Sequence, residues 1–450
     1  MSKPLSKLLP VTCIAENELA AAPLSDAHRA WASANGFSGQ SGKLLALPDG
    51  EGGLAGYAFG LGAAQNRSAL VTGLAAAALP AGRYRLEGEI GDPTLAALGF
   101  RLGAYRFDRY TKAKERPELE LPEGADGAEV ERLTAAASLA RDLINTPAND
   151  LGPDALEAAI VKFASERGFT SRVIKGDALL DENLPMIHAV GRASAQAPRL
   201  LDLSWGDPAH PKVTLVGKGV TFDTGGLNIK PGNSMALMKK DMGGAANILG
   251  LAHAIADAGL KVRLRVLIPV VENAISGSSF RPGDVLASRK GLTVEIGNTD
   301  AEGRLILADA LALADEDKPD LVIDMATLTG AARVALGAEL PPLYAREAGF
   351  AQSVVEAGMA VDDPLWILPL WPGYDTMLSS KIADVNHIST GGMAGSITAA
   401  LFLNRFLDPE TEWLHLDIFA WAPEARPGRP FGGTDQGLRA VYGALKTRFG

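Results

Sequence analysis

The sequence predicts an α/β protein whose C-terminal part is built on a mostly parallel central sheet covered by helices on both faces. Short aliphatic runs such as VTLVGKG and LVIDMAT alternate there with amphipathic segments such as AANILGLAHAIADAG. Strands that are apolar throughout are typical of a sheet buried on both faces. The length of 450 residues is also too great for one ordinary core, which indicates about two or three domains.

Residues 1–125 are expected to form a smaller α/β domain. Apolar stretches such as KLLALPDG, GLAGYAFGLG and GRYRLEGEIG alternate there with glycine-rich turns, a pattern typical of short strands joined by tight connections. Residues 126–146 follow as a helix that connects the domains. The apolar positions that recur at helical spacing within it are Leu133, Ala136, Ala137, Ala140 and Leu143.

The second domain is expected to span residues 147–450. Pro153 and Asp154 suit the start of its first helix. Beyond them, runs such as VRLRVLIPVV and LHLDIFA are typical of strands. In sheets of this kind, ligands bind beyond the carboxyl ends of the strands, so polar residues that directly follow a strand are the first candidates for a site.

Composition and charge exclude several classes of protein. Hydrophobic residues make up 47% and charged residues 21% of the chain, which is globular composition. A net charge of −10 argues against binding to nucleic acid or to anionic lipid, and no apolar run approaches membrane-spanning length. Cys13 is the single cysteine, which excludes an intramolecular disulfide and a thiolate metal cage and predicts a cytoplasmic protein.

The charged residues that stand out lie in two stretches, 218–241 and 298–305. Their acids are Asp223, Asp241, Asp300 and Glu302, and their cations are Lys218, Lys230 and Arg304. Lys218 directly follows the strand VTLVG, and Asp300 follows TVEIGN. Both stretches are therefore expected at one edge of the same sheet.

Each acid has an ordinary interpretation on its own. Asp300 and Glu302 precede an apolar helix, where acids cap free N–H groups. Asp241 precedes another helix, and Asp223 stands before a threonine and two glycines, as turn residues do. Together, however, four acids at one edge repel one another unless they are neutralised. Two divalent cations would balance them, and carboxylate oxygens suit Mg²⁺, Mn²⁺ or a carboxylate-rich Zn²⁺ pair.

The alternatives differ in how well the residues support them. Either Lys218 or Lys230 can join the metals as a neutral amine while the other stays cationic, and spacing alone does not decide which. The phosphate-binding pattern GxxxxGK[ST] is absent, as are HExxH and GxSxG. A dinuclear phosphoesterase stays open, because a lysine and an arginine do not discriminate peptide from phosphate. A DNA-binding role needs a basic groove, which the net charge disfavours.

The sequence resembles the leucyl aminopeptidase family of dinuclear zinc exopeptidases. The blocks VGKGVTFDTGGLNIKP, MKKDMGGAA and NTDAEGRL are similar to the three signature blocks of that family and have the same mutual spacing. The similarity extends over nearly all of the second domain, whereas the N-terminal domain matches weakly apart from LGAYRFDRY. The ending RPFGGTDQGLRA is similar to that of a bacterial aminopeptidase B-like branch.

The resemblance implies a role for each charged residue. The implied metal ligands are Lys218, Asp223, Asp241, Asp300 and Glu302. Asp223 and Glu302 would bridge the ions, with Lys218 and Asp241 on one of them and Asp300 on the other. Lys230 would stabilise the tetrahedral gem-diolate, and Arg304 would hold a bicarbonate that serves as general base. These roles agree with the chemistry of a metal-activated water and a cation facing an oxyanion.

The resemblance also implies a pocket for the first side chain of the substrate. Its implied residues are Met238, Thr327, Leu328 and Gly330, the backbone of Leu328 contacting the peptide. The sequence departs from the family in HLDIFAWAP, where Phe419 and Trp421 replace small or unbranched residues. The preferred first residue therefore stays open.

The resulting expectation is a cytoplasmic metal-dependent aminopeptidase that releases N-terminal amino acids from peptides. A water or hydroxide bridging two divalent ions, which are expected to be Zn, Mn or Mg, is expected to attack the peptide bond. By the same resemblance the enzyme is expected to be a homohexamer, with bicarbonate near Arg304. Neither a membrane nor nucleic acid is an expected partner.

Overall fold

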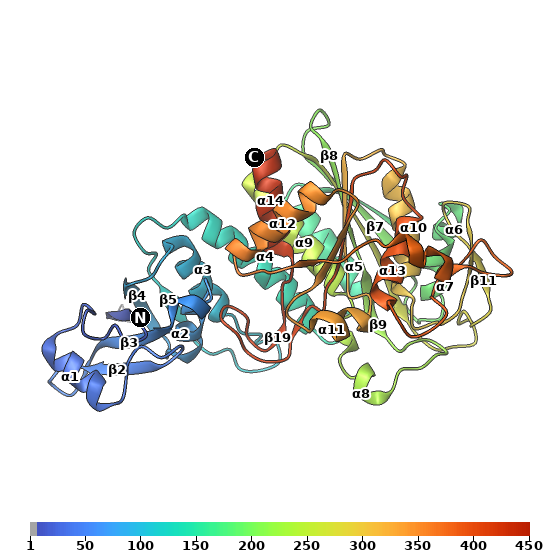
Figure 1. Ribbon diagram of the computed structural model, residues 1–450. Helices are drawn as coiled ribbons and strands as arrows, with labels where there is room; N and C mark the ends of the chain where they lie inside the picture. The colour runs from blue at the N-terminus through green and yellow to red at the C-terminus, as the bar shows by residue number, and fades with distance from the viewer. Residues whose placement is uncertain (1–6) are drawn as a thin grey trace. The chain divides into compact units, whose positions relative to one another are not determined.

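The computed structural model describes residues 7–450, which divide into two compact units (Figure 1). The first unit comprises the residues up to Ser138 together with Ala360–Asp362 and Ala422–Gly432. The second comprises Leu139–Met359, Asp363–Trp421 and Gly433–Gly450. Among the described residues, no helix combines the length and the apolar character needed to cross a membrane.

The first unit is built on a five-stranded sheet. Its strands in spatial order are β2 (Leu44–Pro48), β3 (Leu54–Gly62), β1 (Leu8–Ala15), β4 (Gly82–Gly88) and β5 (Pro117–Leu119). The pairs from β3 to β5 are parallel, and β2 is antiparallel to β3. The helices of this unit are α1 (Asp26–Ala34), α2 (Thr72–Ala78) and α3 (Pro93–Gly103). Alternating strands and helices give it the predicted α/β character.

The second unit contains a nine-stranded sheet. Its strands in spatial order are β15 (Trp366–Ile367), β14 (Pro342–Ala345), β17 (Trp413–Asp417), β13 (Leu321–Ala326), β8 (Lys212–Gly217), β10 (Arg263–Asn273), β7 (Arg199–Trp205) and β6 (Thr170–Lys175), while β9 (Gly219–Asp223) pairs with the far end of β10. The four central strands from β17 to β10 are parallel, β14 and β7 are antiparallel to them, and β6 pairs antiparallel with β7. All six residues of β13 are buried, as expected for a strand covered on both faces.

Helices cover both faces of this sheet (Figure 1). The helices of the second unit are α5 (Pro153–Glu166), α6 (Ala178–Asp181), α7 (Pro185–Gly191), α8 (Gly232–Met235), α9 (Gly243–Ala258), α10 (Gly303–Asp315), α11 (Gly330–Leu336), α12 (Ala348–Ala360), α13 (Gly395–Asn404) and α14 (Leu438–Phe449), and α4 (Gly127–Asn145) leads into it. On one face α9 packs on β8 and β13 with α14 behind it, and on the other α10 packs with α7 and α13. The predicted fold class is confirmed.

One expectation about the site is wrong. Asp300 does not follow a strand of the central sheet, because the strand before it, β12 (Thr293–Glu295), belongs to a separate three-stranded sheet. There β12 pairs with β11 (Val285–Ala287) and β16 (Val385–Asn386). Nor does Asp241 follow a strand, since it ends a 3₁₀ turn. The four acids therefore come from different structural contexts and do not line one edge of one sheet.

A buried network at the C-terminal end of the chain fixes the segment that follows β17. The Asp435 carboxylate lies between the guanidinium groups of Arg141 and Arg439, with 2.8 Å from Arg141 Nη2 to Asp435 Oδ1. All three side chains are fully buried. The next residue, Gln436, accepts hydrogen bonds at its Oε1 from the backbone N–H groups of Phe419 and Ala420, at 2.9 and 2.7 Å.

Removal of this carboxylate should destabilise the fold strongly. The change Asp435→Ala removes the carboxylate that two buried guanidinium groups share, which costs about 3–5 kcal/mol in the free energy of unfolding. Urea denaturation followed by circular dichroism measures the effect. Glu166→Ala removes one acid of an exposed pair with Lys162 and should leave the denaturation midpoint unchanged. Equal midpoints for the two variants would contradict the role assigned to the network.

Candidate metal centre

Asp223 is the last residue of β9 and is buried. Its Oδ1 accepts hydrogen bonds from Asn273 Nδ2 and from the backbone N–H of Gly225, both at 2.8 Å. Gly225 has a φ of +87°, and a Cβ there would lie 2.5 Å from the carbonyl oxygen of Asn228. A side chain at this position is therefore excluded both by conformation and by space. The tight turn holds the Asp223 carboxylate in one orientation.

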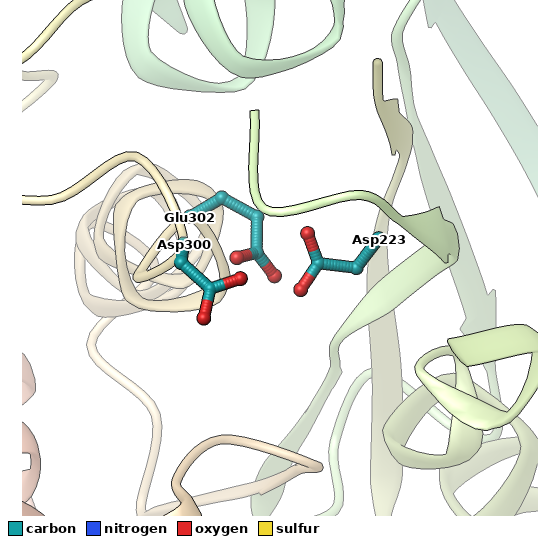
Figure 2. Close-up of side chains that lie close together, drawn as sticks. All are labelled: Asp223, Asp300 and Glu302. Atoms are coloured by element: carbon teal, nitrogen blue, oxygen red, sulfur yellow. The ribbon is translucent and has the colours of Figure 1, made fainter. Parts of the chain in front are cut away.

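Asp300 and Glu302 lie in the turn that leads into α10. This turn is tied to the one after β9 by Thr299, whose Oγ1 donates to the carbonyl oxygen of Gly225 at 2.6 Å and whose N–H donates to Asn228 Oδ1 at 2.9 Å. As a result the carboxylates of Asp223, Asp300 and Glu302 face one another (Figure 2). One oxygen from each lies within 4.8 Å of the others.

Asp241 and Lys218 complete the cluster from the side of β8. Lys218 Nζ lies 2.9 Å from Asp241 Oδ2 and 3.0 Å from Glu302 Oε1, and it donates to the carbonyl oxygen of Thr327 at 2.9 Å. The hydroxyl of Thr327 donates to Asp241 Oδ1 at 2.8 Å. A Cβ on Gly303 would lie 2.8 Å from Lys218 Nζ, so the glycine makes room for the lysine.

Lys230 lies on the other side of the same carboxylates. Its Nζ is 2.8 Å from Asp223 Oδ2 and 2.5 Å from Asp300 Oδ1. Each lysine thus contacts two of the four acids. Lys218 is the more enclosed, with 4% of its side chain exposed against 13% for Lys230.

The acids carry more negative charge than the lysines balance. Burial raises the pKa of Glu302 to about 8, and the carboxylate of Asp223 adds to the shift. Burial lowers the pKa of Lys218, but the carboxylates of Asp241 and Glu302 outweigh it, so this pKa lies above its ordinary value. Within the described part of the chain, Asp241 Oδ2, Asp300 Oδ1 and Glu302 Oε1 are buried and accept no hydrogen bond of good geometry, and each meets only a lysine ammonium. Carboxylate oxygens of this kind fit divalent metal ions.

Arg304 is the second residue of α10 and its guanidinium is buried. Nη1 donates to the carbonyl oxygen of His387 at 2.8 Å, whereas Nε has no partner in residues 7–450. Burial lowers the pKa of Arg304 to about 10. The imidazole of His387 lies 2.9 Å from the carbonyl oxygen of Asn298. His387 was not singled out from the sequence, where nothing but its place in the block ADVNHIS marks it.

The cluster opens into a cavity of about 620 Å³. Besides the charged groups, the residues expected around the first side chain of a substrate line it, namely Met238, Thr327, Leu328 and Gly330. Phe419 lines it too, together with Lys240 and Arg333, which the sequence did not indicate. Trp421 packs against Lys239, whose Nζ lies 5.5 Å from the centre of a tryptophan ring. Glu302 is buried and, unlike the other three acids, is not part of the cavity lining.

An α/β sheet with buried carboxylates and lysines gathered beside a cavity is typical of metallohydrolases. Residues 138–442 match the catalytic domain of the cytosol aminopeptidase family. Residues 9–122 match the N-terminal domain of M17 aminopeptidases, so the likeness covers the first domain as well. The chain belongs to the cytosol aminopeptidase family and is a leucyl aminopeptidase-like hydrolase that depends on divalent metal ions and acts on peptides.

Individual relatives agree with this assignment. A probable cytosol aminopeptidase of Syntrophotalea carbinolica is 42% identical over 368 residues, covering 77% of this chain and 73% of the relative. The crystal structure of cytosol aminopeptidase from Coxiella burnetii is 44% identical, with a TM-score of 0.93 over 100% of this chain and 99% of that one. The bottromycin maturation enzyme BotP in complex with Mn is 35% identical, with a TM-score of 0.89 over 98% and 99% of the two chains.

Asn273 is a positioning residue that sequence reasoning missed. Its amide orients Asp223 and also donates to the carbonyl oxygen of Thr299, at 3.1 Å. Loss of such a partner to a metal ligand typically weakens metal affinity about 10–100-fold. We expect that loss in Asn273→Leu, measured by competition with a chromogenic chelator. Asn404→Leu, which removes an amide bound to Arg346, is the control. Equal affinity in both variants would contradict the role of Asn273.

Proposed function

We propose that the chain releases N-terminal residues from peptides with two divalent metal ions held at the cluster. The proposed ligands are Lys218, Asp223, Asp241, Asp300 and Glu302. The observation that carries the proposal is the cluster of carboxylate oxygens from Asp223, Asp300 and Glu302, which lie within 4.8 Å of one another. When bound, two such ions would lower the pKa of the water between them and polarise the scissile carbonyl. Zn, Mn and Mg fit this donor set.

Asp223 and Glu302 are the proposed bridging ligands. Both are buried, as Asp241 is, and each contacts a different lysine, Asp223 contacting Lys230 and Glu302 contacting Lys218. Asp241 lies on the Lys218 side of this pair and Asp300 on the Lys230 side. This arrangement supports one ion on each side, with Asp223 and Glu302 shared.

The two lysines are proposed to differ in charge. Lys218 is enclosed by its carboxylates and by the carbonyl oxygen of Thr327, a position suited to a ligand. As a ligand it must lose its proton, and a divalent cation among the same carboxylates would lower its pKa. Lys230 is the less enclosed and lines the cavity. It stays cationic and stabilises the tetrahedral oxyanion.

Arg304 is proposed to hold a bicarbonate that accepts the proton of the attacking water. Its guanidinium lines the cavity, and its Nε has no partner in the described part of the chain. A buried cation with a free donor suits a small planar anion. The side chain of the first substrate residue would lie against Met238, Thr327 and Gly330, and its backbone against Leu328.

A cytoplasmic homohexamer is proposed as the assembled form. Large apolar side chains of the second unit are exposed near the edge strand β15, including Trp366 at 51% and Trp371 at 56%. Exposed apolar patches and uncovered edge strands mark surfaces that pack against another chain. The free, buried Cys13 fits a reducing compartment.

Loss of either of two metal-binding acids should abolish the reaction. We expect Asp300→Ala and Glu302→Ala to reduce hydrolysis of leucine p-nitroanilide by at least about 10³-fold, because the metals that activate water and carbonyl are lost. Chelation should abolish wild-type activity, and Mn²⁺ or Zn²⁺ should restore it. N-acetylated substrate should not be cleaved. Asp284→Ala, which removes the acid of a pair with Arg281, is the control and should keep its activity. Activity that persists in both Asp300→Ala and Glu302→Ala would contradict the proposal.

Metal content separates the two lysines. Elemental analysis of Lys218→Met should find about one metal per chain, against about two in the wild type. Lys230→Met should retain both ions while kcat falls about 10²–10³-fold, as for loss of an oxyanion donor. Metal binding to the wild type in weak buffer should also release more protons than binding to Lys218→Met. Loss of a metal from Lys230→Met alone would reverse the assignment.

A further inference from the structure

Three side chains of the cavity form a group that the proposed mechanism does not use. Two cations contact the ring of Phe419. Lys240 Nζ lies 4.8 Å and Arg333 Cζ lies 4.7 Å from the centre of the ring. Lys240 ends the 3₁₀ turn before Asp241, Arg333 lies on α11, and Phe419 follows β17. All three line the cavity that contains the carboxylates.

Neither cation of this group has an anionic partner within residues 7–450. Lys218 and Lys230 each contact two carboxylates, whereas Lys240 Nζ makes no ion pair or hydrogen bond there, although the residue is 1% exposed. Arg333 makes one long contact from Nη1 to the carbonyl oxygen of Thr329, at 3.5 Å. A buried ammonium without a counter-ion is costly, and contact with an aromatic ring compensates only part of that cost.

The acids near this group are already engaged elsewhere. Asp241 is bound by Lys218 and by the hydroxyl of Thr327. The carboxylate of Asp417 accepts hydrogen bonds from the backbone N–H groups of Leu328 and Thr329, at 3.0 and 3.1 Å, and from the Thr329 hydroxyl at 2.6 Å. Lys240 and Arg333 therefore line the cavity with no carboxylate in contact within residues 7–450, and a ligand in the cavity can meet them.

The group lies in the part of the cavity proposed for the first side chain of the substrate. Arg333 Nη2 is 3.6 Å from where a Cβ on Gly330 would lie. Lys240 is in the same short turn as Met238. A pocket for leucine needs apolar walls, whereas here two cations flank the aromatic ring.

We infer that Lys240, Phe419 and Arg333 form a subsite for a substrate carboxylate, so that the enzyme favours peptides beginning with glutamate or aspartate. This inference rests on the proposed aminopeptidase function. The methylene groups of such a side chain can pack on the Phe419 ring while the carboxylate meets the two cations. The C-terminal carboxylate of a short peptide has the same chemistry as the side-chain carboxylate of glutamate. The two lie at different distances from the reacting amine, and the test distinguishes them.

The direct test compares two isosteric substrates that differ in charge, the α-p-nitroanilides of glutamate and glutamine. These anilides have no C-terminal carboxylate, so the ratio of their kcat/KM values reports the first side chain alone. We expect a ratio of at least about tenfold in the metal-loaded wild type, in line with a charge-assisted contact. Lys240→Met and Arg333→Met should each reduce that ratio severalfold, and Arg333→Glu should bring it below one.

Lys239→Met is the matched control. This neighbouring lysine binds the carbonyl oxygen of Asn145 and the ring of Trp421, so its loss should leave the ratio unchanged. Arg333 is half-buried, so its variants keep the test open if Lys240→Met fails to fold. A second comparison uses Leu-Gly-Gly and its C-terminal amide.

Each outcome decides between stated alternatives. Hydrolysis of both anilides by the wild type at equal kcat/KM would overturn the inference and leave the proposed function intact. Sensitivity to Lys240→Met for free Leu-Gly-Gly but not for its amide, with no glutamate preference, would assign the carboxylate to the peptide C-terminus and overturn the subsite as stated. No hydrolysis of any anilide would overturn the proposed function and this inference together.

Discussion

The repulsion among four clustered carboxylates, three of them buried, is the constraint on which the rest of this site depends. Asp223, Asp241 and Asp300 line one cavity, Glu302 lies beside them, and burial makes their negative charge costly. Two lysines offset part of this charge, and each of them contacts two of the four carboxylates. Such a cluster is tolerated only where cations of higher charge join it, as the metal dependence of the family implies. The free energy that metal binding contributes then becomes part of the stability of the fold.

Rigid backbone around the cluster keeps the acids together in spite of that repulsion. Thr299 links the turn after β9 to the turn before α10 through hydrogen bonds to Gly225 and Asn228. On the opposite side α9 lies directly against the sheet, since a Cβ on Gly244 would be 2.1 Å from the carbonyl oxygen of Met325. Backbone that is packed this closely has little room to move. The fold therefore sets the positions of the ligands before any ion binds.

The sequence predicts the fold class and the charged members of the site because both are encoded locally. Continuous apolar strands indicate the central sheet. The acids Asp223, Asp241 and Asp300 each lie within a short block of sequence that can be recognised without knowledge of the fold. What it did not predict depends on pairing between distant segments. β12 has three residues and pairs with β16 about ninety positions later, which no local pattern records. Asn273 is an ordinary polar residue at the end of a strand until folding places it beside Asp223. Lys240 is one of two adjacent lysines until folding places it beside Phe419.

The position of Lys240 shows how one short turn can serve two purposes. In the 3₁₀ turn of Met238–Lys240 and the residue after it, successive side chains point in different directions, because each residue of such a turn rotates by about a third of a full circle. Asp241 therefore faces Lys218 while Lys240 lies against Phe419. The same backbone that fixes a metal ligand fixes a cation in the substrate cavity, so specificity is coupled to the catalytic geometry. A change at Lys240 can alter which side chain is accepted without moving the carboxylate beside it, since the glycines that follow hold that backbone against β13.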